Sequence, residues 1–144
     1  MEVNRSTFFD SGTIAVVGIS KTRGFGNSVY QTLKHQSRTV YPVSLTADTV
    51  DGDRCYKTLT DIPGRIDAVV ITIPATGAVQ VVDDCIRLGI RKIWLQKGIA
   101  PDEAVNRAHA NGVEIIANRC ALMYAQPGGL HKFHATVNRL FGAY

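Results

Sequence analysis

The sequence predicts an α/β fold in which one doubly wound, mostly parallel sheet carries helices on both faces. Short β-branched and apolar runs alternate along the chain with segments whose apolar residues recur at helical spacing. The runs Thr13–Val17 and Asp67–Ile73 are apolar without alternation, as expected of strands that are buried on both faces. A chain of 144 residues matches the size of one domain, so we expect a single domain over residues 1–144.

The composition is that of a globular protein, with 45% hydrophobic and 19% charged residues. The apolar runs fall short of the roughly 18 residues that cross a bilayer, and MEVNRSTFFDSG lacks a signal-peptide core, so we expect a cytoplasmic protein without a membrane partner. Cys55, Cys85 and Cys120 lack close spacing, which indicates reduced thiols rather than disulfides or a metal site. The net charge of +4 is spread without a basic block, which disfavours nucleic acid and favours a small phosphorylated ligand.

The first half of the chain predicts a strand, a loop, a helix and a second strand in that order. The helix is expected from about Ser28 to Gln36, where Ser28 and Gln31 have the spacing of a capping box. The second strand is RTVYPV. Ser44–Pro63 is polar and rich in turn residues, so we expect it to be the least regular part of the fold.

The second half predicts two further helices between strands. Pro74 ends the strand before it, Thr76 is expected to cap the next helix, and Gly89 is expected to close that helix. RKIWLQ is the next strand, a helix ending near Gly112 follows, and VEIIA is the last strand. An amphipathic helix at about 129–141 would either cover an open flank of the sheet or contact a second copy in a homodimer.

The glycine-containing loop Gly18–Asn27 is the strongest chemical feature, because it joins the end of a buried strand to the start of a helix. Free backbone N–H groups and the helix dipole would there form a site for a diphosphate. A side chain at Gly18 would then fill the space into which the diphosphate approaches. Ser20, Asn27 and Ser28 would add polar donors, Lys21 and Arg23 would add positive charge, and Gly26 would let the backbone approach.

The loop lacks the full dinucleotide fingerprint. Its glycines do not read G-x-G-x-x-G, and the second strand ends in YPVSL with no carboxylate for ribose hydroxyls. The alternative is a small NAD(P)-binding redox or sensor protein. Because the strand end lacks an acidic residue, Lys21 and Arg23 would then lie near a 2′-phosphate.

Six segments, taken together, are more specific than the loop. They are IAVVGIS, VYPV, CYKTLTDIP, DAVVITIP, IWLQKGI and NRCALM, in that order. In these segments the chain resembles the CoA-binding domain family, the Rossmann-like module also found at the N-terminus of the succinyl-CoA synthetase alpha subunit. It is most similar to the small stand-alone bacterial members.

The resemblance implies binding of coenzyme A or an acyl-CoA, with the diphosphate on the glycine-containing loop. The residues implied there are Gly18, Ile19, Ser20, Lys21, Arg23, Gly26, Asn27 and Ser28. By position, Pro42, Val43 and Ser44 would border the adenine and ribose, Ile73, Pro74 and Ala75 would follow the pantetheine arm, and Gln96, Lys97 and Gly98 would stand near the thiol end.

No nucleophile and base are arranged as an activated pair, so we expect a binding protein without catalytic residues, or a subunit whose partner supplies catalysis. The four histidines are expected on solvated helix positions, and no metal site is expected. Cys120 is either a small buried hydrophobe or a thiol that faces the CoA sulfur. Trp94 is expected in the core.

Overall fold

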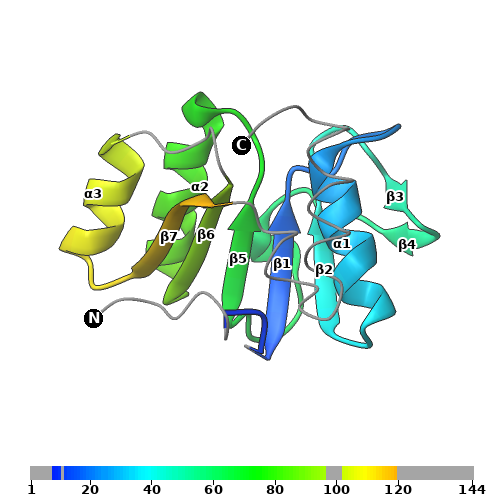
Figure 1. The fold of residues 1–144 in the computed structure, drawn as a ribbon, viewed down its shortest axis with the longest axis horizontal. Helices are drawn as coiled ribbons and strands as arrows, with labels where there is room; N and C mark the ends of the chain where they lie inside the picture. Colours follow the sequence, from blue (N-terminus) through cyan, green and yellow to red (C-terminus); the bar gives the residue numbers. More distant parts are fainter. Residues whose placement is uncertain (1–7, 11, 97–101, 120–144) are drawn as a thin grey trace.

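The computed structural model describes residues 8–10, 12–96 and 102–119, and its centre is a five-stranded sheet (Figure 1). All neighbouring strands of this sheet run parallel, in the order β2-β1-β5-β6-β7. The predicted α/β class is therefore confirmed. The strands are β1 (Thr13–Val17), β2 (Thr39–Val43), β5 (Ala68–Ile71), β6 (Lys92–Gln96) and β7 (Glu114–Arg119).

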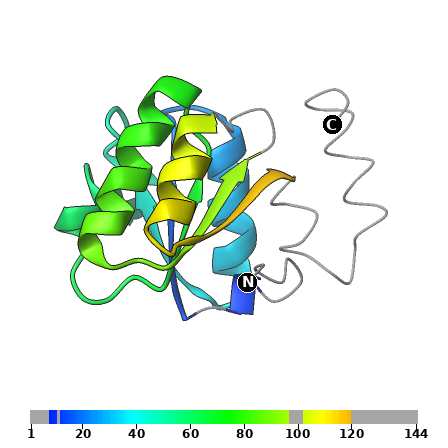
Figure 2. The same cartoon turned by 90° about the vertical axis from the view of Figure 1, so that its left-hand side faces the viewer.

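Helices cover both faces of the sheet. The helix α1 (Phe25–His35) packs on one face, and α2 (Ala75–Leu88) and α3 (Asp102–Ala110) pack on the other (Figure 2). Within the described part of the chain, no helix is both long enough and apolar enough to span a membrane.

Each face of the sheet has its own core, because successive side chains of a strand point to opposite faces. The α1 side holds Trp94, which is fully buried as predicted. Its ring lies 5.3 Å from that of Phe8 and 5.2 Å from that of Phe9, both in the short helix η1 (Phe8–Asp10). The opposite core is aliphatic and packs α2 and α3 against the sheet.

The strand order reverses between β1 and β5. The chain leaves β1, passes through α1 and returns as β2 on one side, whereas β5 lies on the other side of β1. Val17 and Ile71 are register partners at the carboxyl ends of these two strands. Open α/β sheets bind ligands beside such a point, so the fold places a crevice there.

The segment after β2 is the least regular, as predicted. It contains a hairpin of β3 (Thr49–Val50) and β4 (Asp53–Arg54) and the short helix η2 (Leu59–Asp61). Tyr56 forms a parallel bridge with Val43, which extends the edge of the sheet by one residue pair.

Two expected helix starts are wrong. The helix α1 begins at Phe25, with Gly24 as its N-cap, so Ser28 lies inside the first turns and no Ser28–Gln31 capping box forms. The helix α2 has Pro74 as its N-cap, so Thr76 is already helical. Apolar periodicity locates a helix better than its first residue.

The predicted C-cap of α2 is confirmed, because Gly89 adopts the left-handed conformation with φ of 77°. The predicted helix at 129–141, together with Lys97, Gly98 and Cys120, lies outside the described residues.

Candidate functional site

A cavity of about 480 Å³ opens at the carboxyl edge of the sheet, where the strand order reverses. The end of β1, the segments that follow β2 and β5, and the first turns of α2 form its walls. The lining residues are Val17, Gly18, Ile19, Val43, Ser44, Leu45, Thr46, Lys57, Thr58, Leu59, Thr72, Ile73, Pro74, Gly77, Gln80, Val81 and Asp84.

The β1 side of this cavity is tied to the end of β2. The N–H groups of Gly18 and Ile19 both donate to the Val43 carbonyl oxygen, at 3.0 and 3.2 Å. The expectation that the loop offers free N–H groups is therefore wrong for these two residues. Backbone N–H groups that are free to bind a diphosphate must therefore lie after Ile19 in the loop.

Gly18 is required by its own fold rather than only by a ligand. Its φ is +118°, and a Cβ placed on it would collide with the Thr72 hydroxyl oxygen. That hydroxyl donates to the Val17 carbonyl at 2.9 Å and so joins the ends of β1 and β5. The expectation that a side chain at Gly18 fills the diphosphate space is wrong, because Thr72 already stands there.

The sequence prediction missed Thr72. The feature that could have indicated it is a hydroxyl residue at the end of a buried strand. Gly26 serves the same junction from α1. A Cβ on Gly26 would lie 2.5 Å from the Gly18 carbonyl oxygen and 2.8 Å from the Thr72 hydroxyl oxygen. The absence of a side chain thus lets the first turn of α1 pack directly on the strand ends.

Asn27 fixes the shape of the loop. Its amide oxygen accepts a hydrogen bond from the Ser20 N–H at 2.8 Å, and its amide nitrogen donates to the Ser20 carbonyl at 3.0 Å. The Ser20 hydroxyl in turn donates to the Arg23 carbonyl at 3.0 Å. Asn27 is 8% exposed. Both polar side chains therefore hold the loop in place.

The start of α1 offers the free donors. Among the hydrogen bonds of the described residues, none uses the backbone N–H of Gly26 or Asn27, and no side chain caps the helix at Gly24. Lys21 and Arg23 are exposed and form no ion pair within the described structure. An uncapped helix start beside two unpaired cations attracts an anion.

The wall that follows β2 is held by Ser44, which is 4% exposed. Its hydroxyl donates to the Ile19 carbonyl at 2.6 Å and accepts from the Ala47 N–H at 2.9 Å. Leu45 beside it is strongly exposed at the cavity. Ser44 thus shapes the wall, and Leu45 leaves an apolar surface on it.

The wall contributed by α2 was also missed, because the expected contacts all followed strand ends. Asp84 accepts hydrogen bonds from Gln80 at 3.1 Å and from Arg87 at 3.2 Å. Gly77 brings this helix close to Ile73, since a Cβ on it would lie 2.9 Å from the Ile73 Cδ1. The sequence feature that could have indicated this wall is the pair Gln80 and Asp84, which lie one helical turn apart beside Val81.

The predicted residues fall into three groups around this cavity. Six of them line it, namely Gly18, Ile19, Val43, Ser44, Ile73 and Pro74. A second group forms the adjoining loop and helix start, namely Ser20, Lys21, Arg23, Gly26, Asn27 and Ser28. Pro42 is buried within β2 and Gln96 is buried at the end of β6, and neither lines the cavity; Ala75 is the first residue of α2.

The two cysteines of the described residues, Cys55 and Cys85, do not contribute reactive thiols to the cavity. Burial raises the pKa of both the Cys55 and Cys85 thiols above the ordinary value. Neither residue lines the cavity. In the described ranges no three His, Cys, Asp or Glu side chains gather as a metal site would require.

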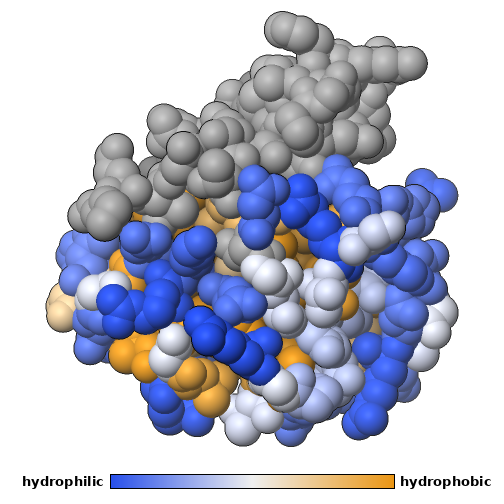
Figure 3. All heavy atoms as spheres, turned by 90° about the horizontal axis from the view of Figure 1, so that it is seen from below, coloured by the Kyte–Doolittle hydropathy of each residue, from blue (hydrophilic) through white to orange (hydrophobic). Residues whose placement is uncertain are grey.

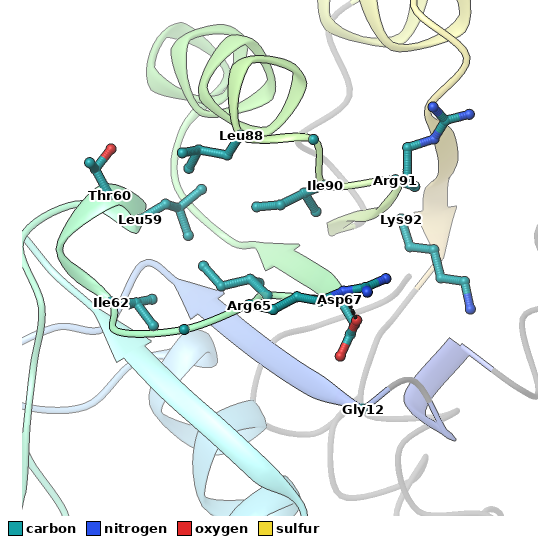
Figure 4. Close-up of a pocket in the computed structure, with 13 residues that line it drawn as sticks. Gly12, Leu59, Thr60, Ile62, Arg65, Asp67, Leu88, Ile90, Arg91 and Lys92 are labelled. Atoms are coloured by element: carbon teal, nitrogen blue, oxygen red, sulfur yellow. Dashed lines mark ion pairs between the residues drawn. The ribbon is translucent and has the colours of Figure 1, made fainter.

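A second cavity, of about 660 Å³, lies at the amino ends of the strands. Figure 4 shows Arg65 beside Asp67, and Arg65 Nε lies 2.9 Å from the Asp67 carboxylate. Leu88 and Gly89, at the carboxyl end of α2, also line it, so the negative end of that helix dipole faces this cavity. Seen from this end, hydrophobic surface shows between hydrophilic side chains (Figure 3). Arg91 and Lys92 line it as well, so this cavity differs from the carboxyl edge in the helix end that faces it rather than in a lack of cations.

Comparison with known proteins identifies the family of this chain. The model of the CoA binding domain family matches residues 12–126, so the chain belongs to this family. It is 30% identical to the alpha subunit of an ADP-forming acetate–CoA ligase from Pyrococcus furiosus, over 93% of this chain and 30% of the relative. An ADP-forming acetate–CoA ligase from Methanocaldococcus jannaschii is 28% identical, over 90% of this chain and 19% of the relative. The chain thus spans less than a third of the length of these relatives.

Solved structures give the same picture. A hypothetical protein from Pyrococcus horikoshii superposes with a TM-score of 0.75 at 28% identity, covering 92% of this chain and 87% of that protein. An acetyl-coenzyme A synthetase from Candidatus Korarchaeum cryptofilum gives a TM-score of 0.70 at 30% identity, over 80% of this chain and 28% of that enzyme. The matched family is the one that the sequence resembles, and coenzyme A is the ligand that the resemblance implied.

Proposed function

We propose, from its membership of the CoA binding domain family, that this chain binds coenzyme A or an acyl-CoA at the carboxyl edge of the sheet. One observation carries this proposal. The cavity of about 480 Å³ opens where the strand order reverses, beside the uncapped start of α1. An adenine nucleotide needs this combination, an apolar slot for the base next to donors for its phosphates.

The diphosphate would lie at the start of α1. The N–H groups of Gly26 and Asn27 have no acceptor within the described structure, and the positive end of the helix dipole stands behind them. Lys21 and Arg23 would add charge-assisted contacts. Ser20 and Asn27 support this site by holding the loop that presents these groups.

The adenosine would occupy the cavity itself. Its walls are largely aliphatic, with Val17, Val43 and Val81 among them. A purine ring buries apolar faces and keeps polar edges, which suits an aliphatic slot with hydroxyl and amide groups at its margin. Thr46 and Gln80 supply such groups.

The pantetheine arm would then run past Ile73, Pro74 and Ala75. These residues follow β5, the neighbour of β1 on the side away from β2. From there the thiol end would reach the edge of β6, where Gln96 ends the strand and Lys97 and Gly98 follow in the sequence.

The proposed role is binding without catalysis. Among the described residues, the titratable side chains that line the cavity are Lys57 and Asp84, and neither is placed as a nucleophile beside a base. Reactions of the thiol or thioester would be supplied by a protein partner.

Titration calorimetry of the purified chain with CoA, acetyl-CoA, NAD and NADP tests the proposal. We expect both CoA compounds to bind more tightly than either nicotinamide cofactor. Tighter binding of NAD or NADP would overturn it in favour of a redox or sensor protein.

A further inference from the structure

We propose that Lys57 binds the phosphate on the 3′ position of the ligand's ribose, and so makes the site select CoA over 3′-dephospho-CoA. This inference rests on the proposed binding of CoA. It starts from one observation: Lys57 is the one cationic side chain among the described residues that line the cavity. Lys21 and Arg23 lie outside that lining, in the loop before α1.

The position of Lys57 is fixed by backbone hydrogen bonds. Tyr56, directly before it, donates its N–H to the Pro42 carbonyl at 2.9 Å and accepts from the Ser44 N–H at 2.8 Å. These two bonds lock the chain onto the end of β2. Lys57 therefore leaves a rigid edge of the sheet at the cavity wall.

The ammonium group of Lys57 is held lightly. Its Nζ lies 3.3 Å from an Asp48 carboxylate oxygen and 3.4 Å from the Ala47 carbonyl oxygen. The Asp48 side chain is 92% exposed, and ion pairs this exposed contribute little to stability. A phosphate can therefore take the place of Asp48 at small cost, at a position where the ammonium already faces an anionic oxygen.

Two separate basic positions match the two anionic groups of CoA. The loop cations Lys21 and Arg23 stand beside the start of α1, where the diphosphate is proposed. Lys57 stands at the cavity, where the adenosine is proposed. The other charged group of the lining, Asp84, already accepts a hydrogen bond from Arg87, so its charge is partly offset. A ribose phosphate would thus find its favourable contact at Lys57.

Calorimetry with CoA and with 3′-dephospho-CoA, on the parent chain and three variants, tests this assignment. We expect the parent to prefer CoA by about tenfold, the worth of one charge-assisted contact. Lys57→Met should lose this preference while keeping the parental affinity for 3′-dephospho-CoA, and Lys57→Arg should retain it. Lys21→Met, the matched control from the loop, should weaken both ligands by the same factor and leave the preference intact.

The outcomes separate the two proposals. A parent that binds neither ligand overturns the proposed function and this assignment with it. A parent that binds both equally, or a Lys57→Met variant that weakens both equally, overturns the role of Lys57 while CoA binding stands. Circular dichroism and thermal unfolding of each variant establish that it is folded before its affinity is measured.

Discussion

The two ends of the central sheet differ in what they offer an anion. The amino-end cavity is the larger, at about 660 Å³ against about 480 Å³, and Arg65, Arg91 and Lys92 line it, but Arg65 is paired with Asp67 and the carboxyl end of α2 faces it. Within the described residues, the carboxyl edge has the start of α1 with unused N–H groups, and Lys21 and Arg23 form no ion pair there. Because the strands of the central sheet are parallel, helix starts collect at one edge and helix ends at the other. The polarity of the helix ends, rather than cavity volume, therefore distinguishes the proposed phosphate site.

Gly18 and Gly26 at the carboxyl edge differ from Gly64 at the amino end in the space around the position of a Cβ. Gly18 and Gly26 at the carboxyl edge are crowded, since a Cβ on either would collide with neighbouring atoms. Gly64, which lines the amino-end cavity, has a φ of +84° and open space around the position of a Cβ. Gly18 and Gly26 therefore need glycine for packing and Gly64 needs it only for its turn, although Gly12 at the amino end is also crowded, by the Asp67 carboxylate.

The largest expected effect comes from exchanging these glycines for alanine. Gly18→Ala combines a positive φ with a collision against Thr72, so we expect a loss of about 3 kcal/mol or more in the free energy of unfolding. Gly64→Ala meets only the backbone penalty and should cost about 1 kcal/mol. Urea denaturation followed by circular dichroism measures both. Equal costs would mean that Thr72 moves aside freely, and the contrast between the two ends would be lost.

The next pair of variants separates an effect on folding stability from an effect on CoA affinity. Asn27 holds the phosphate loop through Ser20, and Asp67 holds the start of β1 by accepting the Thr13 N–H at 2.8 Å. Asn27→Ala and Asp67→Ala each leave backbone groups without partners, so each should lose about 1–3 kcal/mol of stability. We expect only Asn27→Ala to weaken CoA as well, by about tenfold, since it frees the loop that presents the donors. Equal CoA affinity in both variants would show that the loop shape does not matter.

The sequence predicted the sheet well because its signals are local. Unbroken apolar runs such as Thr13–Val17 are typical of strands buried on both faces, and their alternation with helices predicts a parallel, doubly wound sheet. The expectation of a site at the carboxyl ends of the strands came from that fold class. The resemblance then gave the family.

The details of the site depend on contacts between distant residues, which no local pattern encodes. The Val43 carbonyl takes the N–H groups of Gly18 and Ile19 only because β1 and β2 end side by side. Asn27 is predicted as a ligand donor, whereas in the structure its side-chain amide is bonded to the Ser20 backbone. Lys57 reaches the cavity from Ser44–Pro63, which the sequence predicts only as the least regular part of the fold.

A smaller effect is expected from single cations at the two ends. Arg23→Ala removes a charge that has no ion-pair partner in the described part of the chain and lies beside the start of α1, so CoA affinity should fall about tenfold, with the free energy of unfolding within about 0.5 kcal/mol of the parent. Arg65→Ala removes a cation that is already paired with Asp67 at the other end and should leave CoA affinity unchanged. Calorimetry at low salt measures both variants. A fall in affinity for Arg65→Ala would place an anion at the amino end and reverse the comparison.

The smallest expected effect concerns the β3–β4 hairpin, which follows β2 on the carboxyl side and is held to α1 by charged contacts. The Lys34 ammonium, 2.7 Å from the Asp53 carboxylate, and then the Tyr30 hydroxyl hold the pKa of Asp53 below its ordinary value of 3.8. A lowered folded-state pKa means that Asp53 stabilises the fold above pH 3.8, and that this contribution is lost as the pH falls through the lowered value. Asp53→Asn should therefore be less stable than the parent at neutral pH, by less than any stability loss expected above, and this difference should shrink in acid, as the pH falls below 3.8. Urea denaturation at neutral pH and in acid measures this, and Lys34→Met, which removes the partner, should shrink the pH dependence in the same direction. A difference between parent and Asp53→Asn that stays constant with pH would mean that packing of the hairpin, and not its charge, joins it to α1.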